Sequence, residues 1–302
     1  MRQMKRIKRA KYITAAALLA AAIFITAFSR GVFGERLQRV FNPAAAFDTS
    51  SDFVKITDVG QADSILIYSN GCSAVIDVGT EGGVSDILHD LDSARIDEID
   101  ALIVTHLHTD HAGGLPELAN RRKIDNLIIP KLTDSSDAAG LVKDAKRTVT
   151  ANGGNAYTAV QGMNFEIGEF TVTVLAYYDE MKDENNKSVI VMAEIEGIRF
   201  LFTGDAETKT EKALLDDGLD IDCDVLKVAH HGGDSSSTQS FLRAATPEYA
   251  AISVGENNIY SHPSKSVVSA LEDCGAQVLR TDTDGDITFY VENGKLRTET
   301  EK

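Results

Sequence analysis

The feature that most constrains this chain is a histidine-rich segment that directly follows an apolar run. Residues 101–104 (ALIV) are apolar, and residues 105–114 (THLHTDHAGG) hold three of the seven histidines of the chain. A buried strand that runs into a loop can present several side chains at one point, and imidazole and carboxylate groups suit zinc and similar metals. The two glycines let the chain leave the loop closely and begin a helix near Pro116. A histidine-rich surface loop is the plain alternative, but the spacing favours a metal site with the candidate ligands His106, His108, Asp110 and His111.

Two later segments repeat this pattern of an apolar run that ends in possible metal ligands. LFTGD places Asp205 after a glycine, and VLKVAHHGG ends in the pair His230 and His231. TGD alone is typical of a turn, but next to the histidine-rich segment it indicates a ligand. Which of the two histidines would bind a metal is open at this point. His262 precedes a proline and a predicted helix, and it either contacts a phosphate oxygen or leaving group or caps the helix.

The beginning of the chain differs in charge from the rest. The first eleven residues carry six Lys or Arg and no acid, and the remaining 24 basic residues face 46 acidic ones, a formal charge of −22. Such a domain has no general electrostatic attraction for nucleic acid. Any nucleic-acid substrate therefore has to be held by metals and a local basic patch. The three cysteines are far apart and predict neither a disulfide framework nor a cysteine metal site.

Residues 12–29 are uncharged and apolar, which predicts either a membrane-spanning signal anchor or a cleaved secretory signal. With residues 1–11 as a basic cytoplasmic segment, the positive-inside rule places the acidic domain outside the cytoplasm. We therefore expect a single-pass protein of the cell membrane with an extracytoplasmic catalytic domain, or a secreted protein if the segment is cleaved. Residues 30–51 are expected to be a linker, and residues 52–302 a folded domain.

The folded part shows alternating strand and helix patterns and no internal repeat. Apolar alternation and turn signals predict strands at 53–57, 64–68, 73–77, 124–129, 163–167, 170–175, 188–194, 199–203, 225–228, 249–253, 277–280 and 287–291, and a turn at 152–155. Helical periodicity predicts helices at 82–91, 135–150, 206–215, 237–244 and 264–273. The four strands between 163 and 203 are expected to be antiparallel, and periodicity alone gives a mixed α/β class.

HxHxDH after an apolar strand, followed by TGD and HHG, resembles the signature of the metallo-β-lactamase superfamily. The resemblance implies a four-layer αββα sandwich and two divalent metal ions, with zinc expected and manganese as an alternative. One ion would be held by Asp110, His111, Asp205 and His231, and the other by His106, His108 and the shared Asp205. His230 would then contact the substrate, and Asp77 would orient a ligand histidine, as Asp58 and Asp63 would also do.

The chain departs from the superfamily pattern at one position, because residues 112–204 contain no histidine. The site beside His106 and His108 therefore lacks a third imidazole, which a water or a substrate oxygen would replace. Residues 58–64 (DVGQADS) resemble the motif of ComEC-type competence proteins, whose relatives also carry Asn-x-Ser where the histidine is missing. The matching positions here include Asn186 and Ser188, and Asp282 matches a late Arg-Thr-Asp motif.

This resemblance implies an extracellular phosphodiesterase or nuclease that acts on DNA through a metal-bound hydroxide, with Asp110, His230 and His262 as catalytic candidates. Cell-surface phosphorylcholine esterases of teichoic acid share much of the pattern, so a cell-wall or other small phosphodiester is the second candidate substrate. A non-catalytic, metal-binding surface module is the third possibility, which the intact set of ligands disfavours. A basic patch around the metal site would favour the nuclease, and a deep small pocket would favour the esterase.

Overall fold

The computed structural model describes residues 48–132 and 138–302, which belong to one compact unit. The predicted basic segment 1–11, the apolar segment 12–29 and most of the linker 30–51 lie outside the described residues. No helix within 48–132 or 138–302 combines the length and the apolar character that a membrane span requires.

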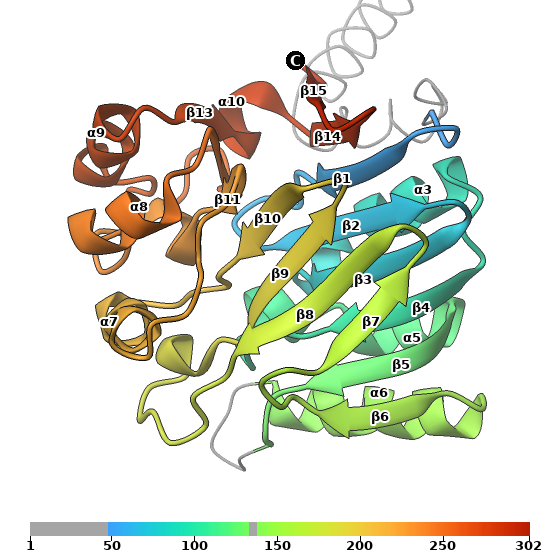
Figure 1. Cartoon of the computed structure of the whole chain (residues 1–302). Coiled ribbons are helices and arrows are strands. Elements are labelled where there is room, and N and C mark those ends of the chain that lie inside the picture. Colours follow the sequence, from blue (N-terminus) through green and yellow to red (C-terminus); the bar gives the residue numbers. More distant parts are fainter. Residues whose placement is uncertain (1–47, 133–137) are drawn as a thin grey trace, which may run out of the picture. The chain divides into compact units, whose positions relative to one another are not determined.

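The strands of the described residues form two sheets that lie face to face (Figure 1). The first sheet has the order β15-β14-β1-β2-β3-β4-β5-β6, antiparallel from β15 to β3 and parallel from β3 to β6. Its strands are β1 (Asp52–Ile56), β2 (Ser64–Ser69), β3 (Cys72–Val78), β4 (Glu98–Ile103), β5 (Lys123–Ile129), β6 (Asn155–Thr158), β14 (Ile287–Val291) and β15 (Leu296–Thr300).

The second sheet has the order β13-β12-β11-β10-β9-β8-β7. Strands β7 to β10 are antiparallel neighbours, as predicted, whereas β10 to β13 are parallel. Its strands are β7 (Asn164–Ile167), β8 (Phe170–Ala176), β9 (Ile190–Ile195), β10 (Ile198–Phe202), β11 (Val225–Lys227), β12 (Tyr249–Ile252) and β13 (Gln277–Arg280).

Helices connect the parallel strands and cover the outer faces of both sheets (Figure 1). The first sheet is covered by α3 (Val84–Ser93), α5 (Leu115–Arg121) and α6 (Ala139–Ala151), and the second by α7 (Thr208–Asp216), α8 (Gln239–Ala245) and α9 (Lys265–Asp273). Shorter helical turns are η1 (Glu81–Gly83), α4 (Thr109–Ala112), η2 (Asn185–Lys187), η3 (Ala229–Gly232) and α10 (Thr281–Asp284). This order of layers confirms the predicted four-layer αββα sandwich.

Two of the apolar cores that hold the layers together lie between the sheets and under the helices of the second sheet. The core between the sheets contains the buried rings of Phe170, Phe200 and Phe289 together with alternate residues of most strands. A second core lies under the outer helices, where Leu214 of α7 and Phe241 of α8 pack with residues of the second sheet. Because alternate side chains of a strand point to opposite faces, β10 contributes to both cores.

The structure corrects the sequence prediction at several elements. Strand β6 covers residues 155–158, of which the first was predicted to end a turn. Strand β15 covers residues 296–300, where no strand was predicted. Both are polar edge strands that pair on one side only, with β5 and β14, so they lack the apolar alternation by which strands are recognised. The helix predicted at 135–150 begins at Ala139, with 133–137 outside the described residues, and the helix predicted at 206–215 is α7.

The carboxyl ends of four strands bring the predicted ligand segments together. Strands β3 and β4 are parallel neighbours in one sheet, and β10 and β11 are parallel neighbours in the other. Asp77 lies near the end of β3, the histidine-rich segment follows β4, Asp205 follows β10 and the histidine pair follows β11. Crevices at the carboxyl ends of parallel strands are common positions for ligand sites.

Candidate metal centre

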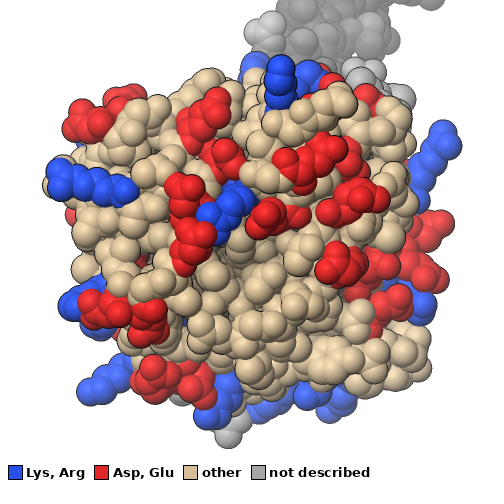
Figure 2. Space-filling model, in the orientation of Figure 1, with Lys and Arg blue, Asp and Glu red and all other residues tan. Residues whose placement is uncertain are grey.

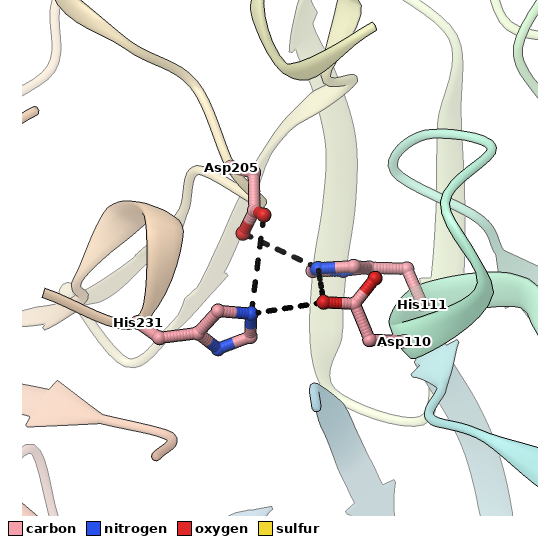
Figure 3. A group of neighbouring side chains, drawn as sticks. All are labelled: Asp110, His111, Asp205 and His231. Atoms are coloured by element: carbon pink, nitrogen blue, oxygen red, sulfur yellow. Dashed lines mark hydrogen bonds and ion pairs between the residues drawn. The ribbon is translucent and has the colours of Figure 1, made fainter. Parts of the chain in front are cut away.

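A first group of donor atoms comes from both sheets and consists of Asp110, His111, Asp205 and His231 (Figure 3). Their donor atoms all lie within 4.8 Å of one another. His111 Nε2 is 3.2 Å from Asp205 Oδ1, and His231 Nε2 is 3.3 Å from Asp110 Oδ2 and 3.9 Å from Asp205 Oδ2. Two imidazoles and two carboxylates around one point match the donor types that zinc prefers.

A second group shares one residue with the first and consists of His106, His108 and Asp205. His106 Nε2 lies 3.0 Å from His108 Nδ1 and 3.8 Å from Asp205 Oδ2. Asp205 is buried between the two groups, which is the position of a carboxylate that bridges two cations. Because the two donor groups share Asp205, the arrangement is a candidate dimetal site.

The charges around the ligands favour a cation at this site. Burial opposes charge here, yet the carboxylates of Asp205 and Asp77 raise the pKa of His111 well above its usual value. Asp205 and its neighbouring carboxylates likewise raise the pKa of His231 to about 10. Protons on these imidazoles thus balance the buried carboxylates, and a divalent ion can take their place. The atoms His111 Nε2 and Asp205 Oδ1 are buried and form an ion pair of 3.2 Å with each other, without hydrogen-bond geometry.

His106 differs from the other two buried imidazoles of the site. Its burial and the neighbouring His111 lower the pKa of His106 well below its usual value, so its ring is neutral. A neutral imidazole is the form that binds a metal. In the metal-free protein, His106 therefore binds a proton less readily than His111 and His231 do.

The geometry distinguishes His230 from His231, either of which could be the metal ligand on the sequence alone. His231 is buried, contacts Asp110 and is fixed by a contact of 3.0 Å from its Nδ1 to the carbonyl oxygen of Ser253. His230 is partly exposed and belongs to a different network, in which its Nδ1 lies 2.9 Å from Ser235 Oγ. The structure thus places His231 in the ligand group and His230 on the wall beside it.

Asp77 supports the first sheet's half of the site. Its carboxylate accepts hydrogen bonds from the backbone N–H (2.8 Å) and the hydroxyl (2.7 Å) of Thr105, and it lies 2.8 Å from His111 Nδ1. A carboxylate bound to Nδ1 leaves Nε2 of the same ring directed at the metal. The predicted orienting role of Asp77 therefore agrees with its position.

Asp63 and Asp58 are placed differently from each other. Asp63 is buried, lies 3.4 Å from His231 Nδ1 and forms an ion pair of 2.7 Å with Lys227, itself buried. Burial opposes ionisation, but Lys227 lowers the pKa of Asp63 below its usual value. Asp58 instead accepts from the Gly60 N–H within its own loop, and its backbone N–H donates to Asp286. Asp63 thus lies beneath the ligands, whereas Asp58 shapes the motif loop.

The positions that replace the expected third histidine belong to the framework around the site. Asn186 is buried and its side chain bonds to Glu207, Asp183 and Thr210, while Ser188 Oγ accepts from the backbone N–H of Asp205 at 3.0 Å. Asn186 therefore holds the loop before β9 in place, and Ser188 holds the backbone of Asp205. Asp282, a further candidate, forms an ion pair with Arg280 of its own segment (2.6 Å).

The neighbouring Asn185 lines the site although sequence reasoning passed over it. Its Nδ2 lies 3.4 Å from Glu207 Oε1 and 3.4 Å from His230 Nε2. Its Oδ1 is buried and has no hydrogen-bond partner. Asn185 therefore offers an oxygen acceptor in the wall of the site. Its signal in the sequence was only its adjacency to Asn186.

The ligand groups open into a cavity of about 470 Å³. None of the residues that line it in the described part of the chain is a lysine or an arginine. His262 lies on its wall, and burial together with His230 and His231 lowers the pKa of His262. The lining residues are Gln61, Thr80, His108, Thr109, Asp110, Asn185, Asp205, His230, His231, Tyr260 and His262.

Comparison with known proteins identifies the superfamily to which this chain belongs. A model of the metallo-beta-lactamase superfamily matches residues 57–256, so the chain belongs to that superfamily, whose members are generally metal-dependent hydrolases. Among curated proteins, the chain is similar to ComE operon protein 3 of Bacillus subtilis (strain 168), at 29% identity over 264 residues, and to competence protein ComA of Neisseria gonorrhoeae, at 28% over 246 residues. The predicted resemblance to ComEC-type competence proteins is therefore confirmed.

These alignments cover 81% of this chain but only 34% and 33% of the two relatives, so the chain spans about a third of their length. Among solved structures, YhfI of Bacillus subtilis has a TM-score of 0.54 at 14% identity, covering 80% of this chain and 100% of that one. CmlA of Streptomyces venezuelae, a diiron beta-hydroxylase, has a TM-score of 0.53 at 16% identity, covering 80% and 54%. These likenesses show the fold alone, and the reaction has to be argued from the site.

Proposed function

We propose that this chain is a two-metal phosphodiesterase whose substrate is single-stranded DNA. The observation that supports this most is the shared carboxylate of Asp205, which lies between two groups of histidine and aspartate donors at the mouth of one cavity. Two ions held by these groups would suit the displacement reactions of phosphoryl groups, in which the attacking and the leaving oxygen both need stabilisation. The similarity to competence proteins supports DNA as the substrate.

Two divalent ions held here would activate a water at neutral pH and neutralise the charge on the phosphate oxygens. The residues of the chain prepare this chemistry. Asp77 and the carbonyl of Ser253 each contact an Nδ1 atom, which leaves Nε2 of His111 and His231 directed at the centre (Figure 3). This orientation keeps both rings in the tautomer that can bind a metal through Nε2.

His230 and His262 are proposed to act on the substrate rather than on the metals. Both line the cavity, and their rings lie 5.5 Å apart. The contact of His230 Nδ1 with Ser235, which in turn donates to Glu207 at 3.0 Å, fixes the orientation of that ring. The ring centroids of His230 and His262 lie 6.4 and 6.5 Å from that of the candidate ligand His231, which suits them to contact a phosphate oxygen or to protonate the leaving group.

The charge of the site favours a single strand over a duplex. The cavity wall has no lysine or arginine among the described residues. On the face drawn in Figure 2, acidic side chains are frequent in the upper half and flank a basic group near the centre, and no continuous basic track crosses this face. A duplex is usually held by many cationic contacts to its phosphates. A single strand needs fewer of them when stacking contributes to binding.

The same absence of cations from the cavity wall favours a second candidate substrate. A small phosphodiester of the cell wall, such as a choline ester of teichoic acid, requires little electrostatic guidance beyond the metals. The dimensions of the cavity accommodate such a molecule, because ligand cavities of about 300–1,000 Å³ are typical of small-molecule sites.

One experiment separates these functions. The purified full chain, loaded with zinc or manganese, is tested on single-stranded DNA, double-stranded DNA and bis(p-nitrophenyl) phosphate, with Asp110→Asn as the inactive control. We expect cleavage of the single strand and the small diester, and little activity of the variant. Cleavage of the small diester alone would exclude DNA and favour the cell-wall substrate. Bound metal without any cleavage would overturn the phosphodiesterase and leave a metal-binding module.

We also propose that the domain lies outside the cytoplasm, attached to the membrane by residues 12–29 or released after cleavage. The basic residues 1–11 before the apolar segment support this orientation. Added protease should degrade the domain on intact cells from which the wall has been removed. Protection of the domain until the cells are lysed would contradict the proposed location.

A further inference from the structure

An exposed aromatic ring stands on the wall of the metal cavity. Tyr260 is 63% exposed and lines the cavity together with Asp110, Asp205 and His231. Its ring is stacked on that of His262, with centroids 5.8 Å apart and an interplanar angle of 30°. Large apolar side chains are seldom this exposed in the described residues, and the adjacent Ile259 is 89% exposed. The two lie in the loop between β12 and α9.

The loop that carries Tyr260 is held in place by one side chain. Asn258 donates through Nδ2 to the carbonyl oxygens of Gly255 (3.0 Å) and His262 (2.7 Å). Its Oδ1 accepts from the backbone N–H groups of Tyr260 (3.1 Å) and His262 (3.0 Å). The backbone on both sides of Tyr260 is therefore fixed, and its ring is presented in a defined place.

The same loop is tied to the first sequence motif. The backbone N–H of Gly255 donates to Gln61 Oε1 at 3.0 Å, and Gln61 itself lines the cavity. The ring is thus fixed relative to both halves of the site. A rigid aromatic ring held beside a metal cluster loses little conformational entropy when a second ring stacks on it.

The chemistry of the cavity indicates what Tyr260 would bind. The metal ligands form one part of the wall and attract phosphate once cations are bound, whereas the described wall has no lysine or arginine to hold a second phosphate. A flat ring attached to the scissile phosphate would find a stacking partner in Tyr260. Stacking on an aromatic side chain is available to every nucleobase because each has a π face.

We propose that Tyr260 is the stacking platform for the nucleobase next to the scissile phosphate, so that the site selects nucleotide diesters over diesters of aliphatic alcohols. This assignment rests on the proposed phosphodiesterase function and names its substrate class. Tyr260 is thereby a specificity-determining residue, whereas His262 beneath it keeps the ring in place. The proposal does not require that Tyr260 take part in the chemical step.

Two matched oligomers test the platform with the metal-loaded full chain. One is a thymidine oligonucleotide, and the other has the same length and phosphates but abasic sugars. Cleavage kinetics and fluorescence anisotropy are measured for wild type, Tyr260→Ala, Tyr260→Phe and Tyr260→Trp. Tyr157→Ala is the control, because Tyr157 is also exposed but does not line the cavity.

For wild type we expect the thymidine oligomer to bind roughly tenfold more tightly than the abasic one, with the difference in KM rather than in kcat. Tyr260→Ala should lose this preference without a change towards the abasic oligomer. Tyr260→Phe and Tyr260→Trp should keep it, since they retain a ring. Tyr157→Ala should behave as wild type.

The proposal is overturned if wild type binds both oligomers equally or neither of them, or if Tyr260→Ala retains the preference. The anisotropy measurement is independent of turnover. If the thymidine oligomer binds with the predicted preference but no diester is cleaved, the phosphodiesterase function fails while the platform stands. If both oligomers are cleaved with the same KM, the platform fails while the phosphodiesterase function stands.

Discussion

Asp77 is the residue on which the orientation of His111 depends. It combines the two hydrogen bonds from Thr105 with the contact to His111 Nδ1. We expect Asp77→Asn to weaken metal binding or activity by about 10- to 100-fold, because an amide can present the wrong group to Nδ1. Isothermal titration with zinc and diester hydrolysis measure both effects. Asp125→Asn, which changes a surface pair with Lys123, is the control, and equal behaviour of the two variants would refute the role.

The adjacent Asn185 and Asn186 should respond to substitution in opposite ways. Asn186→Ala removes several buried hydrogen bonds and should lower the free energy of unfolding by about 2 kcal/mol. Asn185→Ala should leave stability nearly unchanged and instead weaken metal or substrate binding, because its free Oδ1 belongs to the site. Urea denaturation and metal titration of both variants check this contrast. If Asn185→Ala lowered the stability and Asn186→Ala did not, the roles given to the two residues would be wrong.

Residue types and spacing indicated the candidate ligands, and the resemblance to the metallo-β-lactamase superfamily assigned them to two groups. The six predicted ligands, from His106 to His231, fall into the two overlapping groups that the resemblance implied. Asn186 and Asp58 were expected near the ligands and instead hold loops. Tyr260 and Asn185 were missed, because exposure on a cavity wall and an unpaired buried oxygen arise only from tertiary contacts.

At the scale of elements, the site requires the loop after β10 to approach the loop after β4 closely. Gly204 has a φ of 51°, and a Cβ there would lie 2.8 Å from the Thr105 side chain and 2.9 Å from Ser188 Oγ. Gly204→Ala should therefore cost about 3 kcal/mol of stability and displace Asp205.

Gly197 provides the matched control for this substitution. It has a φ of 82° in the turn between β9 and β10, and a Cβ there would meet nothing within 4 Å. Gly197→Ala should cost only about 1 kcal/mol, which reflects the unfavourable φ alone. Urea denaturation of both variants measures the difference, and equal losses would show that the close approach is unimportant.

Most elements could be predicted from apolar periodicity because they bury one or both faces. Strands β4 and β10 are apolar runs, and each leads directly into predicted ligands. The two polar edge strands β6 and β15 escaped prediction because pairing with a neighbour, and not burial, forms them. The antiparallel order of β7 to β10 was predicted, whereas the parallel order of β10 to β13 was not, because it depends on how the helices cross between strands.

At the scale of the whole domain, a buried ionic cluster joins β1, α3 and the segment before β14. Lys55 forms ion pairs with Asp90 and, at 2.8 Å, with Asp286. Burial lowers the pKa of Lys55, but these two carboxylates outweigh burial and raise it above its usual value. The cluster thus ties the beginning of the first sheet to the end of the chain.

A raised lysine pKa has a defined effect on stability. The contribution of Lys55 is complete below the pKa of the unfolded chain, about 10.4, and is lost as the pH rises through the higher folded-state pKa. Lys55→Met should cost about 3 kcal/mol at pH 8, since it leaves buried carboxylates without their cation. Its stability should then fall less than that of wild type above about pH 10. Denaturant unfolding at several pH values tests this, and parallel curves would contradict it.

In the proposed function, Asp205 joins two metal sites into one hydrolytic centre. The most direct test is to titrate the metal-free full chain with zinc or manganese while following the hydrolysis of bis(p-nitrophenyl) phosphate. We expect the rate to rise to a plateau at about two metal equivalents per chain and Asp205→Asn to stay inactive throughout. A plateau at one equivalent with Asp205→Asn still active, or bound metal without hydrolysis at any loading, would contradict it.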